Sequence, residues 1–519
     1  MESLLHLNKY FWKYRLRLIL GLIFIFISNI FGLYPPIYIG EVFNIISDTL
    51  NKTNYDNQFQ NLIKTQLSYY VFLVLAFAVF KGLFMFFMRQ TIIVMSRMIE
   101  YDLKNDIYNH YQKLSLSFYK RNKIGDLMNR ISEDVSRVRM FLGPAILYTT
   151  NLMISICLII PKMASISPKL TLYALSPLPI LVIAIYKVSS VMNIKSEIVQ
   201  RQLSKLSSIS QETFSGIRVI KSYNQEKFAQ NQFMEAAIDY KKKNLDLVKV
   251  NALFFPLMIL LIGLSTLFTI YIGGLEAIAG HIQVGDIATF VIYVNMLTWP
   301  VASLGWVTSI VQRSAASQER INEFLKEEPE IKNSISKTST IRGDIEFNKV
   351  SFTYPDTGIQ AIKNISFTIK EGETLGIIGA IGSGKSTLAE LLCRMIDVES
   401  GSISIRGENI KNINLFDLRS SIGYIPQESF LFSDSIYNNI AFGKQECKNN
   451  EVIKAAKDAG IYNNIIQFKD QFETMIGERG VTLSGGQKQR LSIARALIRK
   501  PKLMLLDDCL SAIDTETEE

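Results

Sequence analysis

One short stretch combines the residue types and the spacing needed to bind a chain of phosphates. It fits G-x-x-x-x-G-K-[ST], in which glycines let successive backbone N–H groups approach phosphate oxygens. Lys385 is expected to reach the β- and γ-phosphates, and the Ser386 hydroxyl can ligate Mg²⁺. The stretch predicts a nucleoside triphosphate as ligand, and its residues are Gly379, Ala380, Ile381, Gly382, Ser383, Gly384, Lys385, Ser386 and Thr387.

The sequence around this loop indicates how it would be positioned. The apolar run Thr374–Gly379 predicts a buried strand before the loop, and Leu388–Leu392 predicts a helix after it. A helix that begins there adds its positive N-terminal end to the phosphate site. An isolated match of this kind could be a glycine-rich turn, but the strand–loop–helix context favours phosphate binding. Alternation predicts two earlier strands, at Ile345–Thr353 and Ile362–Ile369.

Carboxylates and free N–H groups suited to the same ligand follow later in the chain. The short apolar strand that begins at Lys502 ends in Asp507 and Asp508. A carboxylate at the C-terminal end of a parallel strand beside such a loop can hold Mg²⁺ through water, and Asp507 suits that role. A second set of N–H groups, placed just before a helix, suits a γ-phosphate. These groups belong to Ser484, Gly485, Gly486 and Gln487.

The first 310 residues have a different character, because they contain long apolar stretches. A bilayer core takes about 20 apolar residues of helix. Six such stretches in a row, each almost free of charge, favour membrane helices over buried helices of a soluble protein. They lie at roughly 17–43, 67–95, 141–165, 169–191, 251–276 and 286–311.

The distribution of charge favours a lipid bilayer over a nucleic acid as partner. The formal net charge is +9, but Lys and Arg lie mostly between the apolar stretches. The segments 96–140 and 192–250 are rich in both, whereas 273–285 has neither. Cytoplasmic segments carry the excess of Lys and Arg. We therefore expect no nucleic-acid partner, and we place both termini and the two long basic segments in the cytoplasm.

The two long basic segments are too long to be turns, at about 45 and 60 residues. Their apolar residues recur at helical spacing, which predicts that the membrane helices continue into the cytoplasm. Each helix pair would end in a short tip, at Ser117–Asp126 and Glu212–Ile220. Both tips combine an apolar side chain with a glycine, as expected of a short helix that docks on another domain. The alternative is an ordinary turn.

Two cations, Lys81 and Arg89, interrupt the second apolar stretch. A charge inside a bilayer is costly, and it faces an internal cavity or extends to the interface. We expect Arg89 to extend to the interface. For Lys81 both alternatives stay open. The stretches show no relay of acidic residues, which argues against a purely ion-coupled carrier.

Together these features resemble an ATP-binding-cassette (ABC) exporter half-transporter of the type I exporter fold, over essentially the whole chain. The resemblance implies a membrane α-helical domain, with six transmembrane helices and cytoplasmic extensions, plus an α/β P-loop NTPase domain. The expected divisions are a transmembrane domain at 1–325, a linker at 326–342 and a nucleotide-binding domain at 343–519. The last is expected to be incomplete at its C-terminus, because the family's switch histidine and closing strands normally follow the D-loop, here Ser511–Asp514.

The resemblance also implies roles for individual residues. Tyr354 in Phe-Thr-Tyr-Pro resembles the aromatic that stacks on adenine, and Gln427 in Ile-Pro-Gln-Glu resembles the Q-loop glutamine. Gly477–Gly480 resembles the exporter loop that contacts a coupling helix, and the two tips would be the coupling helices. The implied cofactors are ATP and Mg²⁺.

The implied ATP site is shared between two chains. Each ATP would lie between the loop 379–387 of one chain and the signature motif 484–487 of the other, so a dimer is expected. The catalytic residues implied are Lys385, Gln427 and Asp508, and the Mg²⁺ ligands implied are Ser386, Gln427 and Asp507.

The position after the Walker B aspartate Asp507 departs from the family, which normally has Glu where this chain has Asp508. A side chain one methylene shorter withdraws the carboxylate by about 1.5 Å, so hydrolysis at this site is expected to slow. This favours a heterodimer, in which the chain is the degenerate-site half, over a homodimer with two slow sites.

The expected function is ATP-driven export of a hydrophobic or amphipathic substrate, such as a lipid or drug-like molecule, by alternating access. The alternative is an ATP-binding, poorly hydrolysing regulatory subunit of a heterodimeric transporter. An importer is disfavoured, because importers of this superfamily usually keep membrane and ATPase parts on separate chains. The expected location is a bacterial inner membrane.

Overall fold

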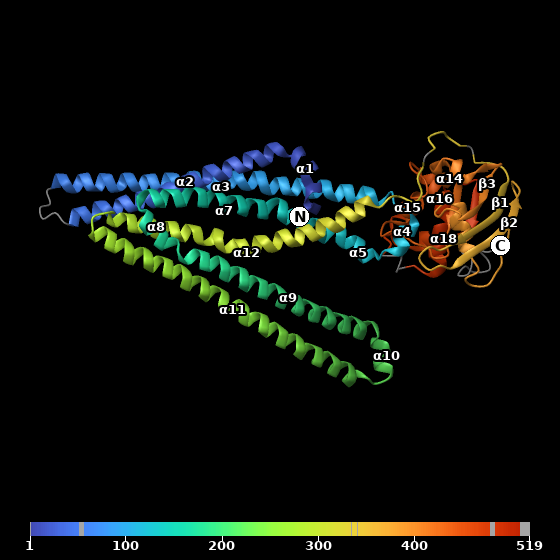
Figure 1. The fold of residues 1–519 in the computed structure, drawn as a ribbon. Coiled ribbons are helices and arrows are strands. Elements are labelled where there is room, and N and C mark those ends of the chain that lie inside the picture. The colour runs from blue at the N-terminus through green and yellow to red at the C-terminus, as the bar shows by residue number, and fades with distance from the viewer. Residues whose placement is uncertain (1, 51–56, 334, 340, 478–482, 509–519) are drawn as a thin grey trace. The chain divides into compact units, whose positions relative to one another are not determined.

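A computed structural model describes residues 2–50, 57–333, 335–339, 341–477 and 483–508. The chain forms two compact units (Figure 1). One is the membrane unit, Met1–Asn109 with Met128–Lys326, and the other is the cassette unit, His110–Leu127 with Glu327–Glu519. The first tip, Ser117–Asp126, therefore groups with the cassette unit rather than with the helices that flank it.

The membrane unit is helical, and six of the helical segments among its described residues are long and apolar enough to cross a membrane. Each contains one of the six predicted stretches, which confirms the predicted fold class. The elements are η1 (Glu2–Leu7), α1 (Asn8–Lys13), α2 (Arg15–Leu50), α3 (Asn57–Tyr111), α5 (Ile124–Asn129), η2 (Arg130–Asp134), α6 (Val135–Met140), η3 (Phe141–Ala145), α7 (Ile146–Ile166), α8 (Pro168–Leu175), α9 (Pro177–Ser215), α10 (Ile217–Ser222), α11 (Glu226–Ile278) and α12 (Val284–Lys326). Of these, α3 ends and α5 begins among the residues of the cassette unit.

Several of these helices extend far beyond a bilayer. Within lipid the backbone must satisfy its own hydrogen bonds, which a helix does along its whole length. α3 has 55 residues and α11 has 53. At 1.5 Å per residue each is roughly 80 Å long, against a hydrocarbon core of about 30 Å. The prediction that the helices extend beyond the bilayer is confirmed. α9 and α11 lie side by side, and the short α10 closes their tip (Figure 1).

Close backbone contact joins α2 to α12. A Cβ built on Gly285 would lie 1.9 Å from the carbonyl oxygen of Gly40, so neither side of this contact has room for a side chain. Asn44 Oδ1 accepts a hydrogen bond from the Gly285 N–H at 2.7 Å, and Thr289 Oγ1 donates to Pro36 O at 3.0 Å. Small residues let membrane helices approach until such bonds form.

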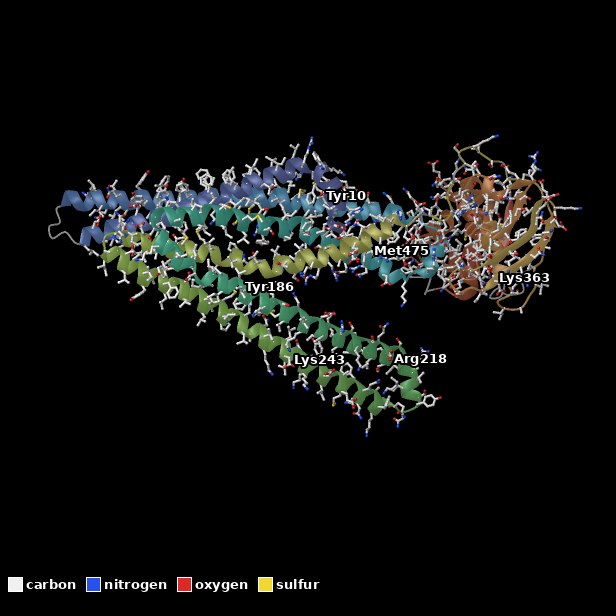
Figure 2. The ribbon with its side chains drawn as sticks, in the orientation of Figure 1. Tyr10, Tyr186, Arg218, Lys243, Lys363 and Met475 are labelled. Atoms are coloured by element: carbon white, nitrogen blue, oxygen red, sulfur yellow. The ribbon has the colours of Figure 1, made fainter. Side chains whose placement is uncertain are left out.

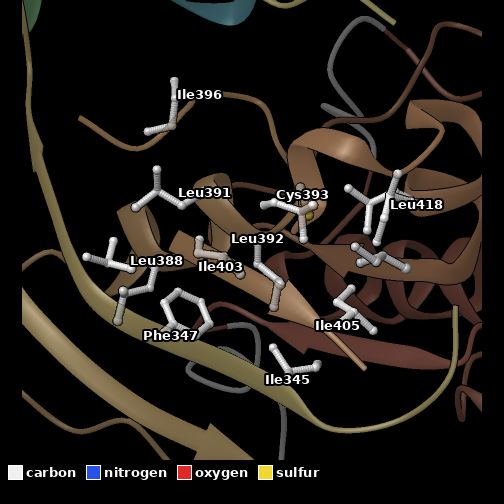
Figure 3. Packing of buried hydrophobic residues seen from close by; sticks show 14 of the residues in the cluster. Ile345, Phe347, Leu388, Leu391, Leu392, Cys393, Ile396, Ile403, Ile405 and Leu418 are labelled. Carbon is white, nitrogen blue, oxygen red and sulfur yellow. The ribbon is translucent and has the colours of Figure 1, made fainter. Parts of the chain in front are cut away.

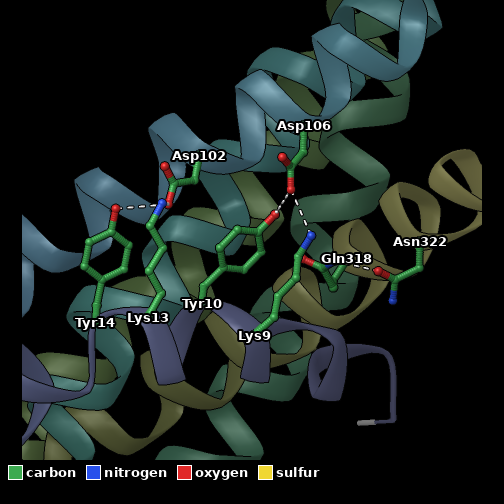
Figure 4. Close-up of polar contacts among 8 residues, drawn as sticks. All are labelled: Lys9, Tyr10, Lys13, Tyr14, Asp102, Asp106, Gln318 and Asn322. Atoms are coloured by element: carbon green, nitrogen blue, oxygen red, sulfur yellow. Dashed lines mark hydrogen bonds and ion pairs between the residues drawn. The ribbon is translucent and has the colours of Figure 1, made fainter. Parts of the chain in front are cut away.

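The N-terminal helix is tied to the part of α3 that follows the apolar stretch 67–95 (Figure 4). Lys9 Nζ and Tyr10 OH both donate to Asp106 Oδ2, at 2.8 and 2.6 Å. Lys13 Nζ donates to Asp102 Oδ2 at 2.6 Å. The two carboxylates lie four residues apart on α3, so they share one face of that helix. The basic N-terminal segment therefore packs along the helix extension.

The described part of the cassette unit contains two sheets. The antiparallel sheet has the order β2-β1-β3-β4, and β5 pairs with β6 in parallel. The strands are β1 (Ile345–Thr353), β2 (Gln360–Ile369), β3 (Ser400–Ile405), β4 (Glu408–Asn409), β5 (Ile422–Ile425) and β6 (Leu503–Leu506). The helices are α4 (Leu116–Arg121), α13 (Lys385–Leu392), η4 (Ile410–Asn412), α14 (Leu415–Ser421), α15 (Ile436–Ala441), α16 (Asn449–Asp458), α17 (Tyr462–Gln467), η5 (Gln471–Glu473) and α18 (Gly485–Leu497).

A core of apolar side chains packs α13 against the antiparallel sheet (Figure 3). Leu388, Leu391 and Leu392 of α13 are buried with Phe347 of β1 and Ile403 of β3. The spacing 388, 391, 392 is the stripe of an amphipathic helix, which explains why this segment folds as predicted. The core therefore fixes the helix that follows the phosphate-binding loop.

The predicted strand before that loop is wrong. Residues 374–379 have no regular secondary structure, and the Ile378 side chain is fully exposed rather than buried. A strand needs a hydrogen-bonded neighbour. Within the described part of the chain, no strand pairs with 374–379. An apolar sequence alone does not supply that neighbour.

Candidate nucleotide-binding site

The phosphate-binding loop requires glycine at two positions. Gly382 and Gly384 have φ values of 81° and 93°, in the left-handed region that glycine enters without a steric penalty. A Cβ on Gly384 would also lie 2.4 Å from the carbonyl oxygen of Ala361 in β2. The sheet therefore holds the loop closely, and α13 begins directly after Gly384.

Lys385, the first residue of α13, lies over the loop. Its Nζ donates to the carbonyl oxygens of Gly379 and Ala380, at 2.7 and 3.0 Å. The ammonium is therefore anchored within the loop, where a triphosphate would compete with these two carbonyls for it. A cation at the N-terminus of a helix combines two attractions for phosphate.

The structure brings the predicted residues Ser386 and Asp507 together, and likewise Gln427 and Asp508. Ser386 Oγ donates to Asp507 Oδ1 at 3.0 Å, and Gln427 Nε2 donates to Asp508 Oδ2 at 3.1 Å. Asp507 and Asp508 follow β6, and Gln427 follows β5 by two residues. Because β5 and β6 are parallel, their carboxyl ends meet at one edge, where α/β folds bind ligands. The short strands thus assemble this part of the site.

The oxygens at this edge fit Mg²⁺. Hydroxyl, carboxylate and amide oxygens are its preferred protein ligands, and Mg²⁺ usually retains waters and phosphate oxygens as further ligands. Among the described residues there is no group of three or more His, Cys, Asp or Glu that could hold a metal ion. Ser386, Asp507 and Gln427 would therefore supply only part of a coordination shell.

Burial, and then the nearby Asp507 carboxylate, raise the pKa of Tyr424 in β5 above its ordinary value.

Tyr354, predicted to stack on adenine, lies beside the end of the loop. Its hydroxyl is 3.0 Å from Thr387 Oγ1, and it donates to Glu390 Oε2 at 3.5 Å. The ring makes an edge contact with Phe352, at 5.0 Å between centroids. Lys120 Nζ lies 5.3 Å from the centroid of the Tyr354 ring. Its role in stacking on adenine stays a prediction, and the nearby ammonium was not foreseen.

The predicted segment Ser484–Gln487 starts a helix, as expected. Ser484 Oγ accepts from the Gln487 N–H at 3.3 Å, and Gln487 Oε1 accepts from the Ser484 N–H at 3.0 Å. This reciprocal pair is a capping box at the start of α18. In the described structure no hydrogen bond or ion pair joins these four residues to the loop 379–387. The predicted residues 478–480 and 511–514 lie outside the described residues.

Sequence reasoning missed one residue of this site, Glu390. Lys120 Nζ donates to both of its carboxylate oxygens, at 2.8 and 2.9 Å. Lys120 belongs to α4 at the first tip, and Glu390 belongs to α13, the helix of the phosphate-binding loop. The signal was a single charged residue within the apolar helix Leu388–Leu392. The tip is therefore linked directly to the nucleotide site.

A helical membrane unit joined to a P-loop cassette defines an ATP-driven membrane transporter, and comparisons with known proteins agree. Residues 18–301 match the family described as ABC transporter transmembrane region, and 362–511 match that described as ABC transporter. The chain belongs to the ABC transporter family, as a half-transporter of exporter type that binds ATP, and it is an integral multi-pass membrane protein.

Three curated relatives illustrate this family. The multidrug resistance-like ATP-binding protein MdlA of Escherichia coli is 32% identical over 519 residues, which is all of this chain and 86% of the relative. The probable multidrug resistance ABC transporter ATP-binding/permease protein YheI of Bacillus subtilis is 34% identical over 518 residues, 99% of this chain and 86% of the relative. An ATP-dependent lipid A-core flippase of Syntrophus aciditrophicus is 33% identical over 445 residues, 85% of this chain and 72% of the relative.

Proposed function

We propose that this chain exports a hydrophobic or amphipathic molecule, lipid or drug-like, by alternating access as half of a dimer. The contact that carries the proposal is the Lys120–Glu390 ion pair, because it joins a cytoplasmic tip to the helix that holds the phosphate-binding loop. A change at the nucleotide would therefore move an element that continues from a membrane helix. The names of the relatives, multidrug proteins and a lipid flippase, support a substrate of this class.

Dimerisation is proposed because each chain has two surfaces suited to a partner. The second tip exposes the aromatic side chains of Phe214 and Tyr223. The N-terminus of α18 makes no hydrogen bond with the chain's own loop 379–387 in the described structure. Two chains would complete two ATP sites, each with the loop of one chain and the Ser484–Gln487 segment of the other. Asp508, which stands where the family normally has Glu, supports a heterodimer over a homodimer.

The proposed reaction is hydrolysis of MgATP, and the chain's own residues have separate tasks in it. When Mg²⁺ is bound it would neutralise phosphate charge, with Ser386, Asp507 and Gln427 as protein ligands. Lys385 would neutralise the β- and γ-phosphates, and Tyr354 would stack on adenine. Asp508 would orient the attacking water, and Gln427 already holds its carboxylate by a hydrogen bond.

Slow hydrolysis at this site is part of the proposal. A misplacement near 1 Å can lower a rate by about 100-fold, and the missing methylene of Asp508 is of that size. The second candidate, an ATP-binding regulatory subunit, gains support from the same residue. In either case we propose the cytoplasmic membrane of a bacterium as the location, with the termini and the cassette inside.

The test is turnover of the complex in proteoliposomes, with Asp508→Glu and with Lys385→Ala as the inactive control. If the site works and is slow because the Asp508 side chain is too short to position the attacking water, Asp508→Glu will raise ATP hydrolysis and ATP-driven substrate movement about tenfold or more. Unchanged turnover in Asp508→Glu would support the regulatory role and contradict the working-site proposal. A native mass spectrum of the same complex distinguishes a second chain of different mass from two identical chains.

A further inference from the structure

Lys81 lies at the middle of its apolar stretch by sequence. It is equally far from both ends of the apolar stretch 67–95. A lysine side chain reaches about 6 Å, whereas the nearest interface is about 15 Å away in a core of about 30 Å. Arg89 can therefore extend to the interface, because it is exposed and nearer the cytoplasmic end of the stretch. Lys81 cannot.

The ammonium of Lys81 rests against α2 at a glycine. A Cβ on Gly32 would lie 3.1 Å from Lys81 Nζ and 3.2 Å from its Cε, so the absence of a side chain there makes room for the cation. Ser28, one turn earlier on α2, donates a hydrogen bond to the Lys81 carbonyl oxygen at 3.3 Å. Lys81 therefore faces the packed surface of α2, where it is half-buried.

A layer of polar side chains continues from this point across α2 to α7. Asn29 Nδ2 donates to Asn151 Oδ1 at 2.9 Å, and Ser155 Oγ donates to Asn29 Oδ1 at 2.7 Å. These residues lie near the middle of the stretches 17–43 and 141–165, at the depth of Lys81. The two amides and the hydroxyl satisfy one another's hydrogen bonds. Within this layer, the charge of Lys81 therefore still requires an anion.

No side chain described in the structure supplies that anion. No carboxylate forms an ion pair with Lys81 among the described residues. In the sequence, acidic residues occur in the six apolar stretches only at or near their ends, at Glu41, Glu276 and Asp286. A second copy of the chain would therefore add no carboxylate at mid-membrane depth. A cation kept in such a place is by default a functional site.

Aromatic side chains of α3 lie on both sides of Lys81 along the helix. Phe77 and Phe84, one turn before and one turn after Lys81 on α3, both contact Phe31 of α2. The ring centroids are 5.5 and 5.6 Å apart. A cation beside such a wall matches a molecule with an anionic group attached to an apolar body.

We propose that Lys81 binds the anionic headgroup, a phosphate or carboxylate, of the amphiphile that this chain moves. This inference rests on the proposed function and narrows its substrate to acidic amphiphiles. Lys81 gains a counterion when the ligand enters, and the aromatic wall of Phe31, Phe77 and Phe84 contacts the apolar part.

The test is equilibrium binding of fluorescent phosphatidic acid to the intact complex in nanodiscs, compared with phosphatidylcholine of the same acyl chains. Lys81→Met keeps the length of the side chain and removes its charge. A hydrogen-bonded charge pair contributes about 1.5–3 kcal/mol, so phosphatidic acid should bind at least tenfold more weakly to Lys81→Met. Lys81→Arg should retain most of the affinity, and phosphatidylcholine should bind both variants as it binds the parent.

Lys187→Met is the matched control, because Lys187 is an exposed lysine of α9 near the cytoplasmic end of the stretch 169–191. The inference is overturned if Lys81→Met and Lys187→Met bind phosphatidic acid equally well. It is also overturned if Lys81→Met weakens both lipids alike, which would mark a packing role. If inorganic phosphate displaces phosphatidic acid at comparable concentration, the site binds a free anion, and the proposal that its ligand is an amphiphile is overturned.

ATP-driven movement of the same lipids separates this inference from the function on which it rests. If the parent complex moves lipid and Lys81→Met moves phosphatidic acid equally well, the headgroup site is wrong while the transport function stands. If the parent complex moves no lipid but Lys81→Met still loses affinity for phosphatidic acid, the binding site stands and the proposed transport of the bound amphiphile fails.

Discussion

The two tips of this chain, Ser117–Asp126 and Glu212–Ile220, follow similar sequence patterns but have different surroundings. At the first tip, Phe118 of α4 is 6% exposed within the cassette unit. At the second, Phe214 next to α10 is 74% exposed. Arg218 also projects from the second tip, which α9 and α11 carry together (Figure 2). An apolar residue and a glycine thus predict a docking helix without identifying the surface on which it docks.

The first tip shows what docking provides. Tyr119 OH donates to Tyr111 O at 2.6 Å, and Tyr111 OH donates to Leu127 O at 2.7 Å, so the segment closes on itself. Lys120 then pairs with Glu390 of α13. The second tip has the same kind of apolar side chain, but it is exposed. We infer that the second tip requires a surface from another chain, and the predictions below test this difference.

The largest effect is expected for Phe118→Ala. Truncating a buried Phe to Ala typically costs about 3–5 kcal/mol, and here that cost would fall on the packing of residues 110–127 against the cassette. Hydrogen exchange of this segment should accelerate in Phe118→Ala, with the helices of the membrane unit unaffected. Phe214→Ala serves as control and should leave this exchange unchanged. Equal protection of residues 110–127 in parent and Phe118→Ala would show that the buried ring does not hold the tip.

Phe214→Ala should have the opposite profile. Because the ring is exposed, thermal stability of the single chain should change by less than about 0.5 kcal/mol. Burial of a Phe side chain against a partner contributes about 1.5–3 kcal/mol, so substrate-stimulated ATP turnover of the complex should fall about tenfold. Phe233→Ala is the matched control, because Phe233 is another exposed Phe and lies on α11 rather than at the tip. A loss of turnover shared by both variants would contradict a specific docking surface at the second tip.

A smaller effect is expected for the Lys120–Glu390 pair. The two side chains retain 39% and 15% of their exposure, so the pair is partly screened by solvent. Partly exposed pairs contribute about 0.2–1 kcal/mol. A double-mutant cycle of Lys120→Met and Glu390→Gln, read out as stability, should give a coupling energy in that range. Each single variant should also reduce the coupling of substrate to ATP turnover, and additivity of the two would argue against a direct link.

The sequence predicted those features that depend on local pattern. Glycines at 382 and 384, the stripe on α13 and the six apolar stretches each have a period or a spacing that short-range physics explains. The proximity of Ser386 and Asp507 was also predicted, because both were expected to hold the same Mg²⁺. Both tips were predicted in position.

Other features depend on contacts between distant residues, and the sequence did not predict them. The run 374–379 is apolar enough for a strand, but a strand exists only with a neighbour, and none is present in the described part of the chain. Glu390 was missed because its partner Lys120 is 270 residues away. The contact between Gly32 and Lys81 was missed for the same reason, since nothing in either stretch specifies which helix packs on which.

The smallest effect of the series is expected where α4 meets Glu330. Ser117 and Arg121 both donate to this carboxylate, and Arg121 and Glu330 are about half exposed. Such a pair is screened by salt and contributes little. Arg121→Gln should lower the protection of residues 110–127 by less than about 0.5 kcal/mol at low salt, and the difference should vanish at about 1 M salt. If Arg121→Gln instead matched Phe118→Ala at every salt concentration, charge rather than burial would hold the first tip, and the second tip would have to be explained in the same terms.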